Sequence, residues 1–363
     1  MAVTSGAAGE SPVAPVKSPT EPRLSRLRRF TNGARSHEET LWRIGGRVGV
    51  LMPLAALVFA LTVLIIKAYP AIRVNGFNFL TGTEWTDGSS YGATVHTDGV
   101  AHPMGSSFGA LPIIVGTLQS SAIALIVAVP ISIGAAFALT ERMPTWISRP
   151  LGFFIEILAG IPSVVIGLWG LLTLGPILAR DVYPIVANRM PDVPVLRFFR
   201  NPTGTGEGLL TAGLVLGLMI IPIIASTTRD LFDQVPPLPK EGASALGMTD
   251  WEVAHKITLP WVRSGIIGAT VLGLGRALGE TVAVALIGGS IIHFAPNIFG
   301  SMTTIAATIL TQLDGAQTDG TGFAVATLAE LGLVLAAISV LVNLLARTII
   351  RRTGSLGPSV GPN

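Results

Sequence analysis

Apolar residues in this chain form long runs separated by polar stretches, instead of alternating with polar residues as in a half-buried sheet. Six runs reach the ~20 residues that a helix needs to cross the hydrocarbon core of a bilayer. They are 45–68, 111–140, 151–178, 208–229, 264–292 and 323–347. The pattern predicts an all-α membrane protein with six transmembrane helices spanning residues 41–350.

The polar stretches predict the remaining parts of the chain. Residues 1–40 are rich in Ser, Pro, Gly and Arg and hold too few apolar residues to fold alone, so we expect a disordered basic tail there. A second tail would follow at 351–363. Residues 69–110 form a long loop between the first two runs, with a hairpin turn expected at Asp98 and Gly99. Residues 230–263 form a polar loop between runs four and five.

The distribution of basic residues predicts the orientation. Six spans place both termini on one side of the membrane, and the segments on that side hold 17 of the 24 Lys and Arg residues. The excess predicts that both termini are cytoplasmic. The net charge of +3 therefore does not indicate nucleic-acid binding.

Composition excludes several kinds of chemistry. The chain is 50% hydrophobic and 12% charged, and it has no cysteine, which excludes disulfides, thiolate metal sites and cysteine nucleophiles. The five histidines are scattered without metal-ligand spacing. None of the four lysines follows a glycine, so there is no phosphate-binding P-loop. We expect no metal, no cofactor and no enzymatic activity, and any nucleotide must be bound by another subunit.

The loop at 230–263 has the signals of two short helices. The segment 241–246 is followed by Gly247, which fits a helix C-terminal cap. Thr249 with Glu252 has the capping-box spacing of a second helix, which Pro260 would end. Two short helices with an apolar face are suited to a groove on another protein.

Two charged residues lie inside the fifth apolar run. Arg276 and Glu280 would be one turn apart on one helix face. A charge at this depth costs roughly 2.5 to 3.5 kcal/mol on insertion scales, so it normally faces a cavity or a partner. The two residues could form an internal ion pair, or the planar guanidinium could hold two oxygens of an oxyanion in a solute path.

The third run contains a helix-breaking site at Gly160, Ile161, Pro162 and Ser163. A helix beginning at Ser163 would direct free N–H groups inward, which can hold an anion. The same proline could instead produce a kink that serves packing only.

The loop motif resembles the EAA signature of permease subunits of ABC importers, with glycine in place of its central alanine. The matching residues are Glu241, Gly242, Ala243, Gly247, Ile257, Leu259 and Pro260. The resemblance implies a type I ABC importer permease fold, in which these residues form coupling helices that dock on a separate ATPase. The segments 108–112, 160–167 and 273–284 resemble the PstC-type permeases of phosphate ABC importers.

This resemblance implies a permease subunit of an ATP-driven importer of inorganic phosphate. It implies a homologous second permease (PstA-like), two copies of an ATPase subunit (PstB-like) and an extracytoplasmic phosphate-binding protein (PstS-like), all around a lipid-embedded path formed partly by Arg276, Glu280 and Ser163. Two alternatives remain open. The solute could be another oxyanion such as molybdate, sulfate or phosphonate, or the chain could be a proton-coupled secondary carrier in which Glu280 titrates.

Overall fold

The computed structural model describes residues 48–49, 51–89, 93–189, 191, 193, 198–200, 204–295 and 297–354. The tail predicted at 1–40 and residues 355–363 lie outside this part of the chain. Two compact units are present, Met1–Thr62 and Val63–Asn363, and the second contains every labelled helix and strand described below. Six helices among the described residues are long and apolar enough to cross a membrane, which confirms the predicted number. They are Leu51–Asn75, Leu111–Arg142, Ser163–Arg189, Leu209–Asp233, Asp250–Leu278 and Phe323–Arg352.

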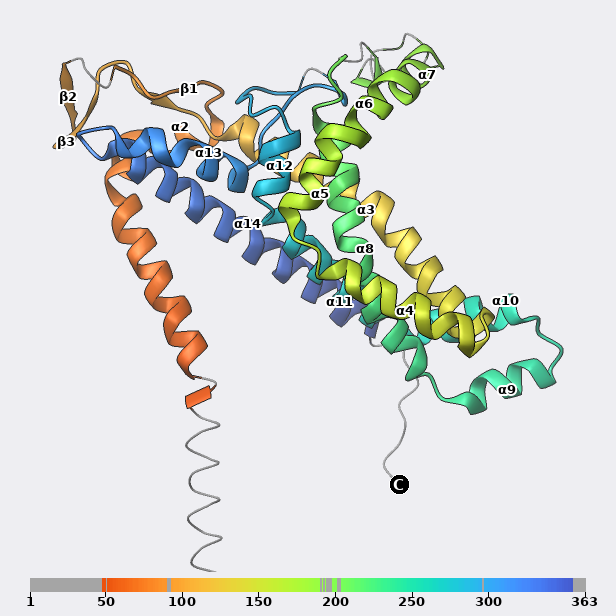
Figure 1. The fold of residues 1–363 in the computed structure, drawn as a ribbon. Helices are drawn as coiled ribbons and strands as arrows, with labels where there is room; N and C mark the ends of the chain where they lie inside the picture. The colour runs from red at the N-terminus through yellow and green to blue at the C-terminus, as the bar shows by residue number, and fades with distance from the viewer. Residues whose placement is uncertain are drawn as a thin grey trace, which may run out of the picture. The chain divides into compact units, whose positions relative to one another are not determined.

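The labelled elements divide these spans and the segments between them (Figure 1). The α-helices are α2 (Asn78–Thr81), α3 (Leu111–Phe137), α4 (Thr145–Ala159), α5 (Ser163–Trp169), α6 (Gly175–Ile177), α7 (Tyr183–Arg189), α8 (Leu209–Asp233), α9 (Pro237–Ala245), α10 (Asp250–Val253), α11 (Leu259–Leu278), α12 (Val282–Ile287), α13 (Ile305–Gln317) and α14 (Phe323–Gly354). The π-helical turns are η1 (Ala138–Arg142), η2 (Gly170–Leu174), η3 (Leu178–Val182) and η5 (Ala254–Thr258). The strands are β1 (Trp85–Thr86), β2 (Thr94–Thr97), β3 (Val100–Pro103) and β4 (Ser107–Phe108).

Small residues allow the central helices to pack closely. A side chain at Gly213 of α8 would lie 2.6 Å from Ile123 of α3, and one at Gly273 of α11 would lie 2.9 Å from Ile224 of α8. Helices in lipid associate through such close backbone approach because hydrocarbon offers no hydrophobic drive between them. Helices α3, α8 and α11 therefore form the fixed centre of the bundle.

The third predicted span, 151–178, is wrong as a continuous helix. Helix α4 ends at Ala159, and a new helix begins at Ser163 and continues through π-helical turns to Arg189. Pro162 has extended backbone torsions and cannot donate a helical hydrogen bond, so it separates the two segments. The predicted helix start at Ser163 is confirmed.

The fifth predicted span, 264–292, is also wrong in its bounds. Helix α10, the turn η5 and α11 follow one another without a break, and α11 ends at Leu278. Pro260 does not end a helix, because the amide of Leu259 bonds to the carbonyl of Ala254 five residues back and the wider turn accommodates the proline. Beyond the break at 279–281, α12 packs on α5, where a side chain on Gly167 would lie 2.8 Å from Ala283.

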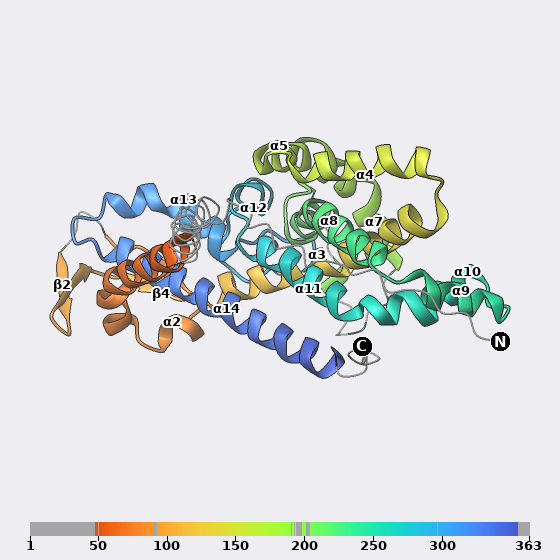
Figure 2. The same cartoon turned by 90° about the horizontal axis from the view of Figure 1, so that it is seen from below.

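The predicted loop at 69–110 begins with the end of the helix Leu51–Asn75, and its described residues contain two short antiparallel strand pairs, β1 with β4 and β2 with β3. Asp98 and Gly99 have φ values of 51° and 78°, which confirms the predicted hairpin turn. Trp85 packs edge-to-face on Phe108 across the first pair. In Figures 1 and 2, β2 and β3 lie at one end of this unit and α9 and α10 at the other.

Candidate functional site

Helix α9 ends as the sequence predicts. Gly247 has φ +83°, a left-handed conformation that favours glycine. Its amide donates to Ser244 (2.9 Å), and the amide of Met248 donates to the carbonyl of Ala243 (3.2 Å), which is the pattern of a Schellman cap. The chain therefore turns sharply between α9 and α10.

Helix α10 begins with the predicted capping box. The hydroxyl of Thr249 accepts a hydrogen bond from the amide of Glu252 (3.3 Å), and the Glu252 carboxylate accepts one from the amide of Thr249 (3.0 Å). Lys256 donates to the same carboxylate one turn later (2.9 Å). Both ends of the turn between α9 and α10 are thus fixed by local hydrogen bonds.

The motif residues in this loop are of two kinds, exposed residues and residues packed against the rest of the unit. Glu241, Gly242 and Gly247 are exposed, whereas Ala243 is buried against the unit. Ile257 and Leu259 are half-buried, and they lie with exposed Pro260 in the segment that joins η5 to α11. The first group can contact another protein, and Ala243 instead anchors α9.

Sequence reasoning missed two residues of this surface. Leu238 is 76% exposed and Leu246 is 83% exposed, although both are large and apolar. They lie four residues on either side of Gly242, and added atoms on that glycine would meet nothing within 4 Å. The spacing 238, 242, 246 is a helix-face signal that could have identified them. We call Leu238, Glu241, Gly242 and Leu246 the α9 surface.

Two ion pairs attach this loop to the end of α3. Lys240 of α9 lies 2.5 Å from the carboxylate of Glu141 in η1, with side chains 22% and 25% exposed. Arg142 lies 3.4 Å from Asp250 of α10, at a more exposed position. Since exposed pairs contribute little, the half-buried pair of Lys240 and Glu141 is the stronger attachment.

Arg276 lines an open cleft of about 550 Å³. The lining residues are Ile223 from α8, Asn343 from α14, and Gly268, Val271, Leu272, Gly275 and Arg276 from α11. Helices α11 and α14 lie side by side (Figure 2). The guanidinium is exposed and is the single charged group among these seven residues. A cleft lined mostly by apolar residues and glycine therefore presents one fork of N–H donors suited to an oxyanion.

Arg276 and Glu280 do not share a helix face, contrary to the prediction. Arg276 is in the last turn of α11, and Glu280 follows the helix end, its amide bonded to the carbonyl of Ala277 (3.4 Å). Both residues are in the described part of the chain, and no salt bridge joins them there. Arg276 is thus available to a ligand.

Ser163 and Glu280 lie near the starts of helices α5 and α12. Each lies at or just before the start of one member of a packed pair of helices, Ser163 at α5 and Glu280 at α12. Neither residue is among those lining the cleft. Ser163 and Glu280 therefore lie near the starts of two helices that pack on each other. Of the three predicted path residues, Arg276 is the one that lines the cleft.

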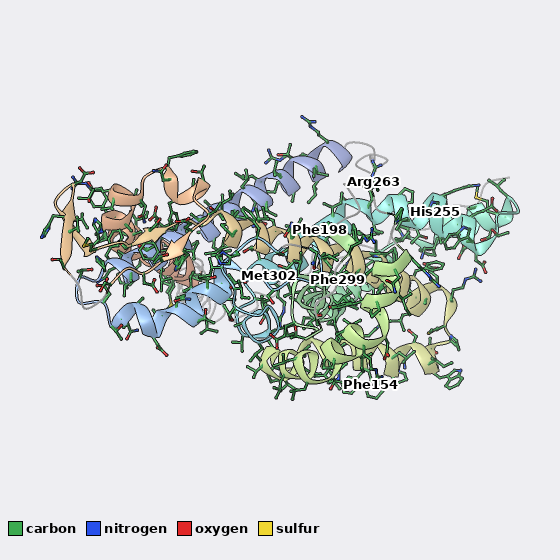
Figure 3. The ribbon with its side chains drawn as sticks, turned by 90° about the horizontal axis from the view of Figure 1, so that it is seen from above. Phe154, Phe198, His255, Arg263, Phe299 and Met302 are labelled. Carbon is green, nitrogen blue, oxygen red and sulfur yellow. The ribbon has the colours of Figure 1, made fainter. Side chains whose placement is uncertain are left out.

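The surface and the cleft are connected by one helical segment. His255 and Arg263, labelled in Figure 3, lie along the continuous segment of α10, η5 and α11. This segment begins at Asp250, three residues after Gly247, and ends at Leu278, two residues after Arg276.

Comparisons with known proteins identify relatives that match most of this chain. Residues 128–355 match the family described as binding-protein-dependent transport system inner membrane component. The chain is 58% identical over 317 residues to the phosphate transport system permease protein PstC 1 of Mycobacterium tuberculosis, covering 87% of this chain and 94% of that protein. It is 39% identical to the PstC protein of Pasteurella multocida, covering 86% and 92% of the two chains.

A solved structure shares the fold. A chain of a bacterial alginate ABC transporter, crystallised with an alginate-bound periplasmic protein, matches with a TM-score of 0.54 and 18% identity, covering 87% of this chain and 99% of that one. At this identity the match supports the fold alone.

Proposed function

This chain belongs to the binding-protein-dependent transport system inner membrane components, and within them to the PstC permeases of phosphate transport systems, and from this premise we propose how its parts act. It is a multi-pass membrane permease subunit of a phosphate ABC importer. We propose that Arg276 lines the solute path and that the α9 surface docks on the ATPase.

The exposed guanidinium of Arg276 carries the path proposal. It lies in a mostly apolar cleft, and no carboxylate of the described residues pairs with it. Its planar fork can donate two parallel hydrogen bonds to phosphate. Glu280 and Ser163, near the starts of the packed helices α12 and α5, would contact the solute before or after it reaches Arg276.

The exposed apolar and acidic residues of α9 support docking on an ATPase. Leu238 and Leu246 are too exposed to stabilise this chain by themselves, and a groove on a partner would bury them. Ile257, Leu259 and Pro260 would transmit the movement, because they join η5 to α11. Closure of two ATPase subunits would then displace α9 and α10 and alter the cleft at Arg276.

Membership of the PstC permeases supports the remaining partners. A homologous PstA-like permease would complete the path, two PstB-like ATPases would bind at the α9 surface and its counterpart, and a PstS-like phosphate-binding protein would dock at the opposite face. Both chain termini would then be cytoplasmic, consistent with the excess of Lys and Arg on that side.

Uptake by the reconstituted importer tests this proposal. With ATP enclosed in vesicles and binding protein outside, we expect labelled phosphate to accumulate, and molybdate and sulfate to accumulate far less. An uncoupler should leave uptake unchanged, because ATP supplies the energy. Uptake that persists without ATP and collapses with the uncoupler would instead identify a proton-coupled carrier. Preferred uptake of molybdate or sulfate would change the assigned solute.

The ion pair between Glu141 and Lys240 predicts a coupling defect. Glu141→Lys places two cations together at a half-buried position, so α9 should separate from the end of α3. We expect fewer phosphate ions imported per ATP hydrolysed, measured in the same vesicles. Adding Lys240→Glu restores opposite charges and should recover most of the ratio. A double variant no better than the single one would contradict a role for this pair.

A further inference from the structure

The cleft at Arg276 contains a second polar side chain, Asn343 of α14. It is exposed and lies opposite α11, on a helix of 32 residues, with a long apolar stretch before it and Leu344, Leu345 and Ala346 after it. An amide in contact with hydrocarbon lacks hydrogen-bond partners and is costly. Two polar groups facing one cleft indicate that the cleft is filled by water, solute or protein when the subunit is assembled.

Asn343 retains hydrogen-bonding capacity toward the cleft. Its Nδ2 donates one hydrogen bond to the carbonyl of Ser339, one turn earlier (2.9 Å). A side-chain amide has two N–H donors and an acceptor oxygen, so one donor remains. That N–H can bind an oxyanion without adding a positive charge.

Two of the seven residues that line the cleft are glycines. Gly268 and Gly275 of α11 both line it, and an added Cβ at either glycine would meet no atom within 4 Å. Packing within this chain therefore does not require glycine at these positions. Glycine inside a helix costs about 1 kcal/mol relative to alanine. The open space beside these glycines is large enough to admit a solute.

We propose that Asn343 is a second phosphate contact in the path, acting together with Arg276. This inference rests on the proposed function. Arg276 supplies charge and holds the anion, whereas a neutral amide binds it weakly and lets it leave. Transport requires that the solute also leaves, and a path with strong binding sites alone would retain it. By its position toward the C-terminal end of α14, Asn343 would act on the cytoplasmic side of Arg276.

Thiol labelling tests the position of Asn343. Because the chain has no cysteine, Asn343→Cys adds the single thiol of this subunit to the complete importer. We expect the impermeant anionic reagent methanethiosulfonate ethylsulfonate to lower its phosphate uptake roughly tenfold, and inorganic phosphate during ATP turnover to slow the labelling. Leu344→Cys is the matched control, since Leu344 is 56% exposed and does not line the cleft. It should retain uptake after the same treatment.

The outcomes separate the two proposals. An importer with the natural sequence that takes up no phosphate contradicts the proposed function itself. If that importer is active and Asn343→Cys is not labelled, or is labelled without loss of uptake, Asn343 lies against lipid or protein and the inference is overturned. A labelling rate that phosphate does not change also counts against contact with the solute.

Charge substitution provides a second measurement. Asn343→Asp keeps the side-chain shape and adds a negative charge, so repulsion should lower the maximal phosphate uptake roughly tenfold. Asn343→Ser, which keeps a donor, should retain most of it. Equal uptake by the two variants would overturn the inference, and co-purification of all subunits would verify assembly in both.

Discussion

Arg276→Ala should abolish phosphate uptake by the complete importer while all subunits still assemble. Two charge-assisted hydrogen bonds to the anion are lost, each of about 1.5 to 3 kcal/mol, which lowers the rate roughly a hundredfold or more. Folding should be little affected, because the guanidinium is exposed in the cleft and forms no salt bridge among the described residues. Labelled phosphate uptake and subunit co-purification measure the two effects.

Three variants accompany this measurement. Arg276→Lys keeps the charge without the fork and should retain partial uptake. Arg180→Ala removes an exposed arginine that is paired with Asp181 (2.9 Å), and it should leave uptake unchanged. Since Arg276 and Glu280 form no ion pair, Arg276→Ala with Glu280→Ala should be no better than Arg276→Ala alone. Normal uptake by Arg276→Ala would remove this residue from the path.

Gly247→Val should separate the permease from its ATPase. A β-branched residue at φ +83° is strained by about 1 to 2 kcal/mol or more, so the turn between α9 and α10 should change shape. The α9 surface would then no longer match its groove. Nothing lies within 4 Å of an added Cβ at Gly247, and the effect is therefore one of backbone conformation. Co-purification of the ATPase is the measurement.

The control for Gly247 uses a residue that tolerates the same conformation. Gly247→Asn should retain most ATPase binding, because asparagine adopts left-handed torsions more readily than other residues with a side chain. Leu246→Asp tests the surface independently of the turn, since Leu246 is 83% exposed and its replacement leaves this chain's core intact. The ATPase should also fail to co-purify with the Leu246→Asp permease. Full co-purification with both Gly247→Val and Leu246→Asp would contradict docking at α9.

Local signals in the sequence predicted much of the structure of the polar loop at 230–263. The cap at Gly247 and the capping box of Thr249 and Glu252 each depend on residues within one or two turns, and the structure confirms them. The prediction that Pro260 ends a helix is wrong. A proline in the first turn after a π-helical turn cannot be distinguished by sequence from a proline that ends a helix. The exposure of Leu246 depends on the whole fold and could not be read locally.

The spans show a similar division. Hydropathy located six of them, but residues 264–292 contain no proline to mark the break after α11. That break arises from tertiary packing, in which α12 lies against Gly167 of α5. Because α11 ends at Leu278, between Arg276 and Glu280, the helix face predicted from their spacing does not exist. Their functional roles remain predictions for the experiments above.

The uncovered cleft also concerns the synthesis of this subunit before it meets its partners. A free chain would expose Arg276 and Asn343 within the bilayer, and an arginine at such a depth costs roughly 2.5 to 3.5 kcal/mol on insertion scales. Association with a second permease would remove that penalty. Membrane proteases recognise poorly stabilised segments, so an excess of this chain over its partner should be short-lived in the cell. The polar groups that serve an anion would thereby also keep the two permeases in equal amounts.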